Sequence, residues 1–368
     1  MSISAKNLWR FLCAAAAIIL MAAALNFAVD PLQLFRAARL FPAMYSADSR
    51  MQNAGLIRSQ DFDTVFMGTS LAIHFRQSDI DKALGARSLK LAMTGSNSRE
   101  QNFVLAAAMA RRPKRVIWQM DDWIFRDAPE IDSDIYVPAD LYRRNAKGIA
   151  GYLFSGAMAR ESLWLVARAI PPFEPVVARL TNGVMFRFPI SRVDDINTLR
   201  PDFDVAGFYN AKSAVDTFRR ITDPARSSSI AEGYNYDAMV RNFERDAIAL
   251  IENNPDVSFD IYFAPYSILH FVAMRDASPA TLKIAHDFAA YAFPRLLQFP
   301  NVRLSDFRDV KDVTHELGNY GDVIHHSPAT DLKILSWLAE QKYVVDRAKP
   351  LASLERLKAQ VDAYKFEP

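Results

Sequence analysis

The sequence predicts an α/β protein: a parallel sheet flanked by helices, with a helix-rich insertion and one N-terminal transmembrane helix. Three observations support this fold class. An uncharged apolar segment lies close to the start of the 368-residue chain. Short apolar runs then alternate with stretches of helical periodicity, as in βαβ units with right-handed crossovers. Between about residues 123 and 235 the alternation stops, and we interpret that part as an insertion over the sheet.

The uncharged segment runs from Phe11 to Val29 and contains one polar side chain, Asn26. At 1.5 Å per residue it spans roughly 28 Å, close to the hydrocarbon thickness of a bilayer. Lys6 and Arg10 precede it. Positive charge on that side predicts that residues 1–10 are cytoplasmic and that everything after residue 30 is exported.

A cleaved signal peptide is the competing interpretation of this segment. It is rich in alanine, and 22–24 offers small residues of the kind that signal peptidases cut after. The run is longer than a typical apolar core of a signal peptide, which favours a retained anchor. Both interpretations place the soluble domain on the same side of the membrane.

The elements of the soluble part follow in order. Residues 30–60 form a linker and a lead-in helix, 61–345 the α/β domain, and 346–368 an amphipathic tail that packs on its own domain or on a partner. The predicted strands are 64–67, 88–93, 115–120, 258–263 and 302–307. The predicted helices are 78–84, 98–111, 236–253, 279–293, 329–341 and 351–364. Ser278 and Pro279 suit a helix start, and Pro294 is expected to end or kink the helix.

Composition excludes several classes of function. The net charge of +2 gives no electrostatic basis for binding nucleic acid. The single cysteine, Cys13, lies in the apolar segment, so the soluble part has no cysteine nucleophile and no cysteine-ligated metal. We expect no cofactor and no metal, because no phosphate-loop or zinc-ribbon spacing is present.

Two strand ends and one late loop carry residues whose side chains are candidates for catalysis. The first strand ends in Gly68-Thr69-Ser70, and the second in Thr94-Gly95-Ser96-Asn97. The loop from 319 to 328 contains Asp322 and His325. Ligands of open parallel sheets bind beyond the carboxyl ends of the strands, where these residues are expected. A serine hydroxyl needs a base within hydrogen-bond reach and a group that orients that base. Ser70, His325 and Asp322 therefore form a candidate catalytic triad.

These blocks, in this order, resemble the SGNH/GDSL hydrolase superfamily. The similarity is greater to its membrane-anchored bacterial branch, which includes proteins of alginate and other cell-surface polysaccharide O-acetylation. The resemblance extends over about residues 29–341, apart from the insertion. Further matching blocks are Val29-Asp30-Pro31 after the membrane segment, 112–118, and Asp322-x-x-His325 with His326 where an aromatic residue is usual.

The resemblance implies a flavodoxin-like sheet and a serine esterase or O-acetyltransferase. Ser70 would be the nucleophile, His325 the base and Asp322 its partner, with the backbone amides of Ser70 and Gly95 as the oxyanion hole. The substrate would be an acyl ester or a cell-envelope polysaccharide, and a membrane-bound acyltransferase would be a partner. The location would be the bacterial inner membrane with the domain in the periplasm.

The third block departs from the family pattern. The oxyanion-donating asparagine of the family has no counterpart, because the strand ends in Gln119-Met120-Asp121-Asp122. The side chain of Gln119 or of Asn97 is the remaining candidate to replace that asparagine as the hydrogen-bond donor to the oxyanion. The departure keeps a second hypothesis open: a non-catalytic envelope component that binds glycan or a membrane acyltransferase.

Other interpretations of the same residues stay open. Ser70 can cap the following helix, and His325 can be a loop histidine bonded to backbone. His325, His326 and Asp322 can form a metal site. His74 is a weaker alternative base, and Asp121-Asp122 can be a solvated strand end. The pairs at 143–144 and 219–220 are solvated arginines, or they line a path for an anionic glycan.

Overall fold

The computed structural model describes residues 5–39, 49–127, 137–169, 207–224 and 231–366. The chain divides into two compact units. One contains residues 1–60 and 137–199, and the other contains residues 61–136 and 200–368. Parts of the predicted linker and of the predicted insertion, at 40–48, 128–136, 170–206 and 225–230, lie outside the described residues.

The larger unit is built around a five-stranded sheet in which every strand pair is parallel. Its strands are β1 (Thr64–Met67), β2 (Ser88–Lys90), β3 (Arg115–Gln119), β4 (Ser258–Phe263) and β5 (Val302–Asp306). Their order is β2-β1-β3-β4-β5, which is a doubly wound order. The order reverses between β1 and β3, so the crevice that binds ligands in such sheets opens at the carboxyl ends of these two strands.

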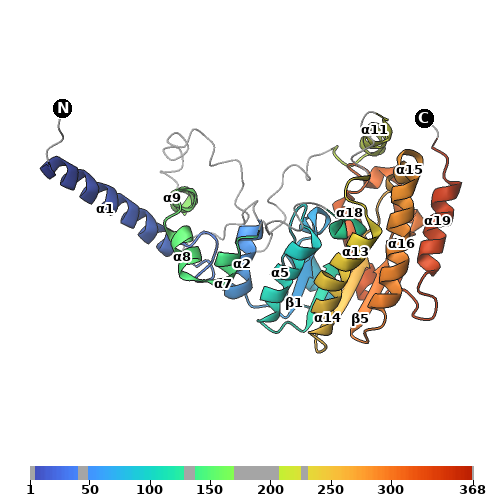
Figure 1. Cartoon of the computed structure of the whole chain (residues 1–368), viewed down its shortest axis with the longest axis horizontal. Coiled ribbons are helices and arrows are strands. Elements are labelled where there is room, and N and C mark those ends of the chain that lie inside the picture. Colours follow the sequence, from blue (N-terminus) through green and yellow to red (C-terminus); the bar gives the residue numbers. More distant parts are fainter. Residues whose placement is uncertain (1–4, 40–48, 128–136, 170–206, 225–230, 367–368) are drawn as a thin grey trace. The chain divides into compact units, whose positions relative to one another are not determined.

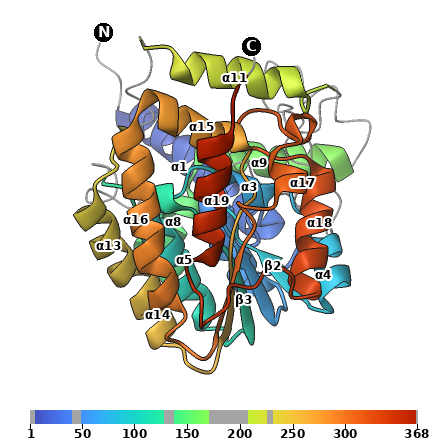
Figure 2. The same cartoon turned by 90° about the vertical axis from the view of Figure 1, so that its right-hand side faces the viewer.

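Helices cover both faces of this sheet, as Figures 1 and 2 show. One face carries α5 (Ser98–Met109), α13 (Tyr236–Phe243) with α14 (Ala249–Glu252), and α16 (Pro279–Leu296). The other carries α4 (Gln77–Leu84) and α18 (Pro328–Ala339), which pack on each other. Both faces are therefore buried, which accounts for the apolar runs at 65–67 in β1 and at 116–118 in β3.

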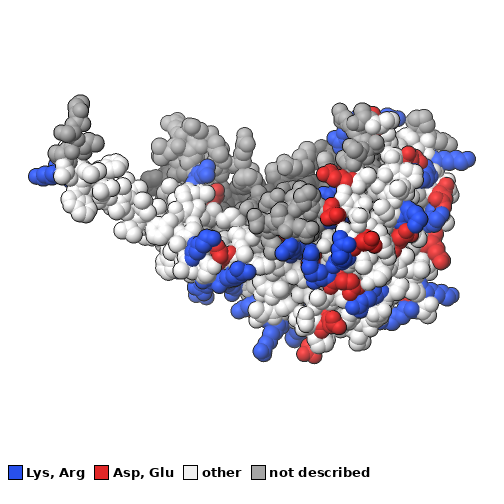
Figure 3. Space-filling model, in the orientation of Figure 1, with Lys and Arg blue, Asp and Glu red and all other residues white. Residues whose placement is uncertain are grey.

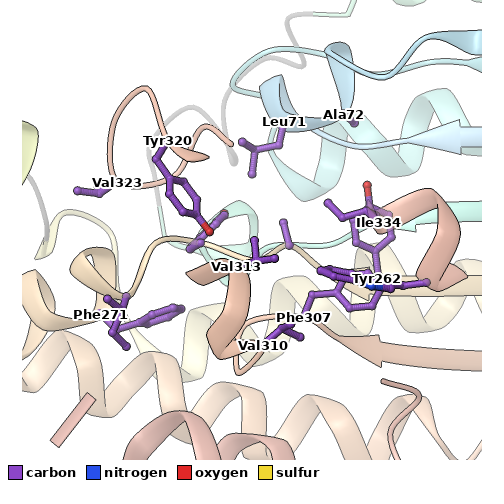
Figure 4. Close-up of a cluster of buried hydrophobic side chains, with 14 of the residues drawn as sticks. Leu71, Ala72, Tyr262, Phe271, Phe307, Val310, Val313, Tyr320, Val323 and Ile334 are labelled. Atoms are coloured by element: carbon purple, nitrogen blue, oxygen red, sulfur yellow. The ribbon is translucent and has the colours of Figure 1, made fainter. Parts of the chain in front are cut away.

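Aromatic side chains fill the core on the α4 and α18 side. Phe66 of β1, Tyr262 of β4 and Phe307, which directly follows β5, form a row of neighbouring rings, and Trp337 of α18 extends it. Figure 4 shows part of this cluster, with Leu71 from the turn after β1 and Tyr320 from the late loop among its members. Residues on either side of the candidate site therefore share one hydrophobic core.

The remaining elements of this unit are short or lie at its edges. They are α3 (Ser70–Ile73), a 3₁₀ turn η1 (Asp122–Phe125), α11 (Ala211–Thr222), α15 (Ile268–Ala277), α17 (Lys311–Thr314), a 3₁₀ turn η6 (Leu317–Asn319) and α19 (Ala352–Ala363). α19 packs on α15 and α16, so the C-terminal amphipathic helix covers its own domain. Leu354, Leu357 and Val361 form its buried side.

All five predicted strands are present, and the second is shorter than expected. Two helices differ in detail. α16 continues through Pro294 to Leu296, so this proline does not end it. The helix predicted over 236–253 contains a π-helical segment, η5 (Glu244–Ile248), which interrupts its regular period. α15 was not predicted, because apolar residues occur all around it and give no period.

The smaller unit contains α1 (Ala5–Val29), α2 (Ser49–Ser59), α7 (Ala139–Arg143), α8 (Ala146–Leu153) and α9 (Gly156–Ala169). α8 and α9 pack on α1, and α7 packs on α2 and α8. By length and composition, α1 is the one helix among the described residues that is able to cross a membrane. The sequence predicted one insertion over 123–235, whereas the structure groups 137–169 with the first 60 residues and α11 with the sheet.

Candidate active site

The turn that carries Ser70 begins where β1 ends. The backbone passes from Met67 through Gly68 and Thr69, and Ser70 is the first residue of α3. Gly68 has no room for a side chain, because an added Cβ would lie 2.5 Å from Gln119 Oε1 and 2.6 Å from Ala72 Cβ. Gln119 therefore reaches the turn from β3, where its Oε1 accepts a hydrogen bond from the Thr69 amide at 2.9 Å.

The loop that carries Asp322 and His325 is folded as a small antiparallel turn. Tyr320 and His326 form a bridge, the Gly321 amide donates to the His325 carbonyl, and the Ser327 amide donates to the Asn319 carbonyl. Hydrophobic burial fixes this turn. The ring of Tyr320 is fully buried, and its hydroxyl donates to the Pro265 carbonyl at 2.6 Å.

Ser70, His325 and Asp322 form a chain of hydrogen bonds. Ser70 Oγ lies 2.9 Å from His325 Nε2, and His325 Nδ1 lies 2.6 Å from Asp322 Oδ2. The carboxylate can only accept, so the proton of the neutral imidazole is assigned to Nδ1 and Nε2 is left to accept from the serine hydroxyl. These are the contacts that a nucleophile, its base and the orienting group of that base require.

Asp322 is held in place by two backbone amides of its loop as well as by the imidazole. Its Oδ1 accepts from the amides of Ile324 and His325, both at 2.7 Å. Burial acts to raise the pKa of Asp322, but the hydrogen bond from His325 and these two amides outweigh it, and the pKa lies below its ordinary value. The group is therefore an anion at neutral pH, and it stabilises a protonated imidazole.

Comparison of the chain with protein-family models and with curated protein sequences found no match. The superfamily resemblance remains a prediction, and the chemistry of the site rests on its geometry. His325 is the histidine that lies within hydrogen-bond distance of Ser70. The ring of His74, the alternative base, has its centroid 6.1 Å from that of His325.

Gly95 lies close to the serine turn because the chain after β2 continues to follow β1. The Met93 amide donates to the Gly68 carbonyl at 2.9 Å, and Gly95 then turns the chain with a φ of +62°. A side chain is disfavoured at this angle, while open space surrounds the position of an added Cβ. Gly95 therefore turns the chain close to the carboxyl end of β1.

Asn97 and Gln119, the two replacement donors, have structural contacts. Asn97 caps α5, because its side chain accepts from the Glu100 amide and the Glu100 carboxylate accepts from the Asn97 amide. Gln119 accepts from Thr69 and donates to the Asp121 carboxylate. Gln119 thus stabilises the serine turn through its hydrogen bond with Thr69. The backbone amides of Ser70 and Gly95 remain the candidate oxyanion donors.

Asp121 and Asp122 are buried and are not a solvated strand end. Burial raises the pKa of Asp121 to about 6, although hydrogen bonds from Tyr266 and Gln119 oppose the shift. Burial also raises the pKa of Asp122, against the opposing charge of Arg308. Asp121 Oδ2 lies 3.3 Å from Thr69 Oγ1, so this carboxyl group is in contact with the residue that precedes Ser70.

His326 and His325 do not share one site. His326 is buried, and its Nδ1 lies 3.0 Å from Asp331 Oδ1 at the start of α18. Lys90 is buried near this pair and donates to the carbonyls of Ile73 and Phe75, at the end of the turn after Ser70. The adjacent histidines thus have separate carboxylate partners, which is inconsistent with joint binding of one metal ion.

Sequence reasoning missed the aromatic neighbours of the triad on the α15 side. The ring of His270 packs against Tyr266, with centroids 4.9 Å apart. Burial lowers the pKa of His270 to about 4, although the nearby Asp322 carboxylate opposes the shift. His270 is therefore neutral at physiological pH. No sequence motif marks these residues. They lie near the triad because α15 follows β4, and β4 lies beside β3 in the sheet.

Proposed function

We propose that this chain is a serine-dependent acyl-ester hydrolase or O-acyltransferase of the SGNH type that acts on a cell-envelope polysaccharide or a related acyl ester. The observation that carries the proposal is the continuous hydrogen-bonded chain from Ser70 Oγ through the His325 imidazole to the Asp322 carboxylate. Its position after β1, at the point where the strand order reverses, also supports the proposal.

In the first half of the reaction, His325 Nε2 takes the proton of Ser70 while Oγ forms a bond to the acyl carbon. The charge that develops on the carbonyl oxygen is stabilised by the amides of Ser70 and Gly95. The carbon–oxygen bond of the donor ester then breaks, and its alkoxide takes the proton from Nε2. Asp322 stabilises the imidazolium during this transfer. The product is an acyl group on Ser70 and a free alcohol.

In the second half, the hydroxyl of an acceptor gives its proton to Nε2 and attacks the acyl carbon. The bond from that carbon to Ser70 Oγ breaks, and Oγ takes the proton back. With water as acceptor the reaction is hydrolysis, and with a sugar hydroxyl it is transfer. Both outcomes use the same three side chains.

We also propose that α1 is retained as a single membrane anchor with its N-terminus in the cytoplasm. Lys6 and Arg10 at one end and Asp30 at the other support this orientation. The sheet-containing unit would then lie in the periplasm of a bacterium, next to envelope glycans and to any membrane-bound acyltransferase that supplies the acyl group.

The test is turnover of an aryl acetate by the full chain in detergent micelles, together with covalent labelling by a fluorophosphonate. Ser70→Ala should abolish both, since it removes the nucleophile. Ser258→Ala is the matched control, because Ser258 is an exposed serine at the amino end of β4. Turnover and labelling that survive in Ser70→Ala would contradict the proposed nucleophile.

Absence of turnover and labelling in the unaltered chain would favour the second candidate function. This is a non-catalytic envelope component that binds glycan or a membrane acyltransferase. The contacts of Gln119 support this second function. Its side chain accepts from Thr69 and donates to Asp121, so it does not serve as the side-chain oxyanion donor of the resembled family. The assay should be repeated with an oligosaccharide acceptor, because a strict transferase hydrolyses esters poorly.

A further inference from the structure

The polar residue of the apolar segment is integrated into the smaller unit. Asn26 is fully buried. Its Nδ2 donates to the carbonyls of Leu153 and Ser155, at 2.8 and 3.2 Å, and its Oδ1 accepts from the hydroxyl of Ser162 at 2.9 Å. The turn between α8 and α9, and the middle of α9, are therefore attached to α1 at the level of residue 26.

A second group of hydrogen bonds fixes the chain where α1 ends. Asp30 accepts from the amides of Leu34, Phe35 and Arg36, at 2.8 to 3.0 Å. The hydroxyl of Tyr152, at the end of α8, donates to Asp30 Oδ1 at 2.9 Å. The C-terminal end of α1 and the end of α8 therefore form one packed body.

Large apolar side chains are exposed at this same level. Phe154 lies between the two residues whose carbonyls accept from Asn26, and 54% of it is exposed. Leu163, which follows Ser162, is 49% exposed. Phe27, which follows Asn26, is 48% exposed. The exposed apolar side chains of α1, which begin at Leu8, end at Phe27, so Phe154 and Leu163 adjoin the far end of that apolar surface.

The helices of this unit also carry exposed cations. Arg143, Arg144, Lys147 and Arg160 are exposed. Two acidic residues, Asp140 beside Lys147 and Glu161 beside Arg160, neutralise only part of this charge. Figure 3 shows Lys and Arg side chains gathered over α7 and α8. Apolar side chains next to a membrane helix, with lysine and arginine nearby, are the features of a surface that lies on an anionic bilayer.

We propose that the turn between α8 and α9 inserts into the outer headgroup layer of the membrane that α1 crosses. Phe154 and Leu163 would enter the boundary between headgroups and acyl chains, and the cations of α7 to α9 would contact anionic lipid headgroups. The partner of this surface is the lipid itself. The inference is independent of the chemistry of Ser70, and it rests on the proposal that α1 is a membrane anchor.

Spin labels on single cysteines test this inference in the full chain, reconstituted in vesicles of phosphatidylethanolamine and phosphatidylglycerol. Labels are placed at Phe154→Cys and Leu163→Cys in a Cys13→Ala background. The native Cys13 serves as the reference for the bilayer interior. Tyr236→Cys, at an exposed position in α13, serves as the reference for water. The measured quantity is the ratio of collisions with oxygen to collisions with a water-soluble nickel chelate.

We expect a ratio at Phe154→Cys and Leu163→Cys that is several-fold higher than at Tyr236→Cys and closer to that at Cys13. A ratio equal to that at Tyr236→Cys, with Cys13 still shielded, would overturn this inference and leave the anchor intact. Access of the nickel chelate to Cys13 as well would overturn both. Replacement of phosphatidylglycerol by phosphatidylcholine should lower the ratio at Phe154→Cys, and an unchanged ratio would contradict the role of the cations.

Discussion

Ser70 Oγ lies 2.9 Å from His325 Nε2, although 255 positions separate the two residues in the sequence. Two kinds of contact bring them together. β1 lies between β2 and β3 in the sheet, and this sets the position of the serine turn. The buried ring of Tyr320 draws the late loop into the core beside Leu71 of α3. Packing thus holds the pair before any substrate arrives, and this lowers the entropic cost of catalysis.

The Asp322→Asn variant tests the orienting role of the carboxylate. An amide at this position can present an N–H to His325 Nδ1, which favours the wrong tautomer of the imidazole. We expect turnover to fall by roughly 10³–10⁴-fold, as for the orienting residue of a serine triad. The measurement is kcat for an aryl acetate together with the circular dichroism of the folded protein. A loss of less than about tenfold with the fold intact would remove Asp322 from the proposed mechanism.

The Gly68→Ala variant tests the close approach of Gln119 to the serine turn. The added methyl group would lie 2.5 Å from Gln119 Oε1 and 2.6 Å from Ala72 Cβ, so either β1 or its neighbours must shift. Overpacking of this kind costs about 1–3 kcal/mol of unfolding free energy. Urea denaturation followed by tryptophan fluorescence measures the loss.

Two companion variants make the result for Gly68 specific. Gly68→Ala combined with Gln119→Ser should recover part of the loss, because the shorter side chain makes room for the methyl group. Gly151→Ala, in the middle of α8 with open space around it, should leave stability unchanged or raise it by up to about 1 kcal/mol. Equal losses from both glycine variants would contradict the steric explanation.

The Asp121→Asn variant should change how stability depends on pH. Its pKa is raised from 3.8 to about 6 in the folded chain. Between these values the folded state keeps a proton that the unfolded state has lost, so this group stabilises the fold at low pH and the contribution is lost as pH rises to 6. The difference amounts to at most about 3 kcal/mol. In Asp121→Asn, the free energy of unfolding should not show this decline as pH rises.

The measurement for Asp121 is the free energy of unfolding at pH 4.5 and at pH 7.5. Asp256→Asn, at an exposed position, controls for the loss of one negative charge. The stability of Asp121→Asn relative to the unaltered chain should be higher at pH 7.5 than at pH 4.5. An equal difference at both values would show that Asp121 titrates normally.

The pair formed by His326 and Asp331 is predicted to matter for folding. Both side chains are buried and lie 3.0 Å apart, so Asp331→Ala leaves the imidazole and the nearby Lys90 without their carboxyl neighbour. A buried polar group that loses its polar neighbour costs about 1–3 kcal/mol of unfolding free energy. His326→Phe combined with Asp331→Leu replaces the pair by apolar groups and should restore most of the loss.

An exposed pair provides the comparison for Asp331. Asp287 pairs with Lys283 on the surface of α16, and Asp287→Ala should change the unfolding free energy by at most about 0.5 kcal/mol. Urea denaturation midpoints of the four proteins give the answer. A cost for Asp331→Ala as small as that for Asp287→Ala would mean that the buried pair contributes little.

Much of the architecture was predictable because it depends on local sequence. β1, β3 and β4 contain short apolar runs, and a glycine, an aspartate or a proline follows each within two residues. Burial on both faces of a parallel sheet favours such runs. The N-cap and capping box at Asn97 are likewise local, as is the proline at the first turn of α18. The π-helical segment at 244–248 was not predictable, because it arises where α13 packs against α5 and α16.

The sequence by itself determined the class of fold, the apolar helix near the N-terminus and the three residues of the candidate triad. Apolar periods and turn residues act over a few neighbours, and these patterns carry that information. Only the tertiary structure decided that His325 and not His74 contacts Ser70, that Gln119 braces Thr69, and that residues 137–169 pack with α1. These contacts join segments far apart in the chain, and their formation depends on how whole elements bury their apolar surfaces against each other.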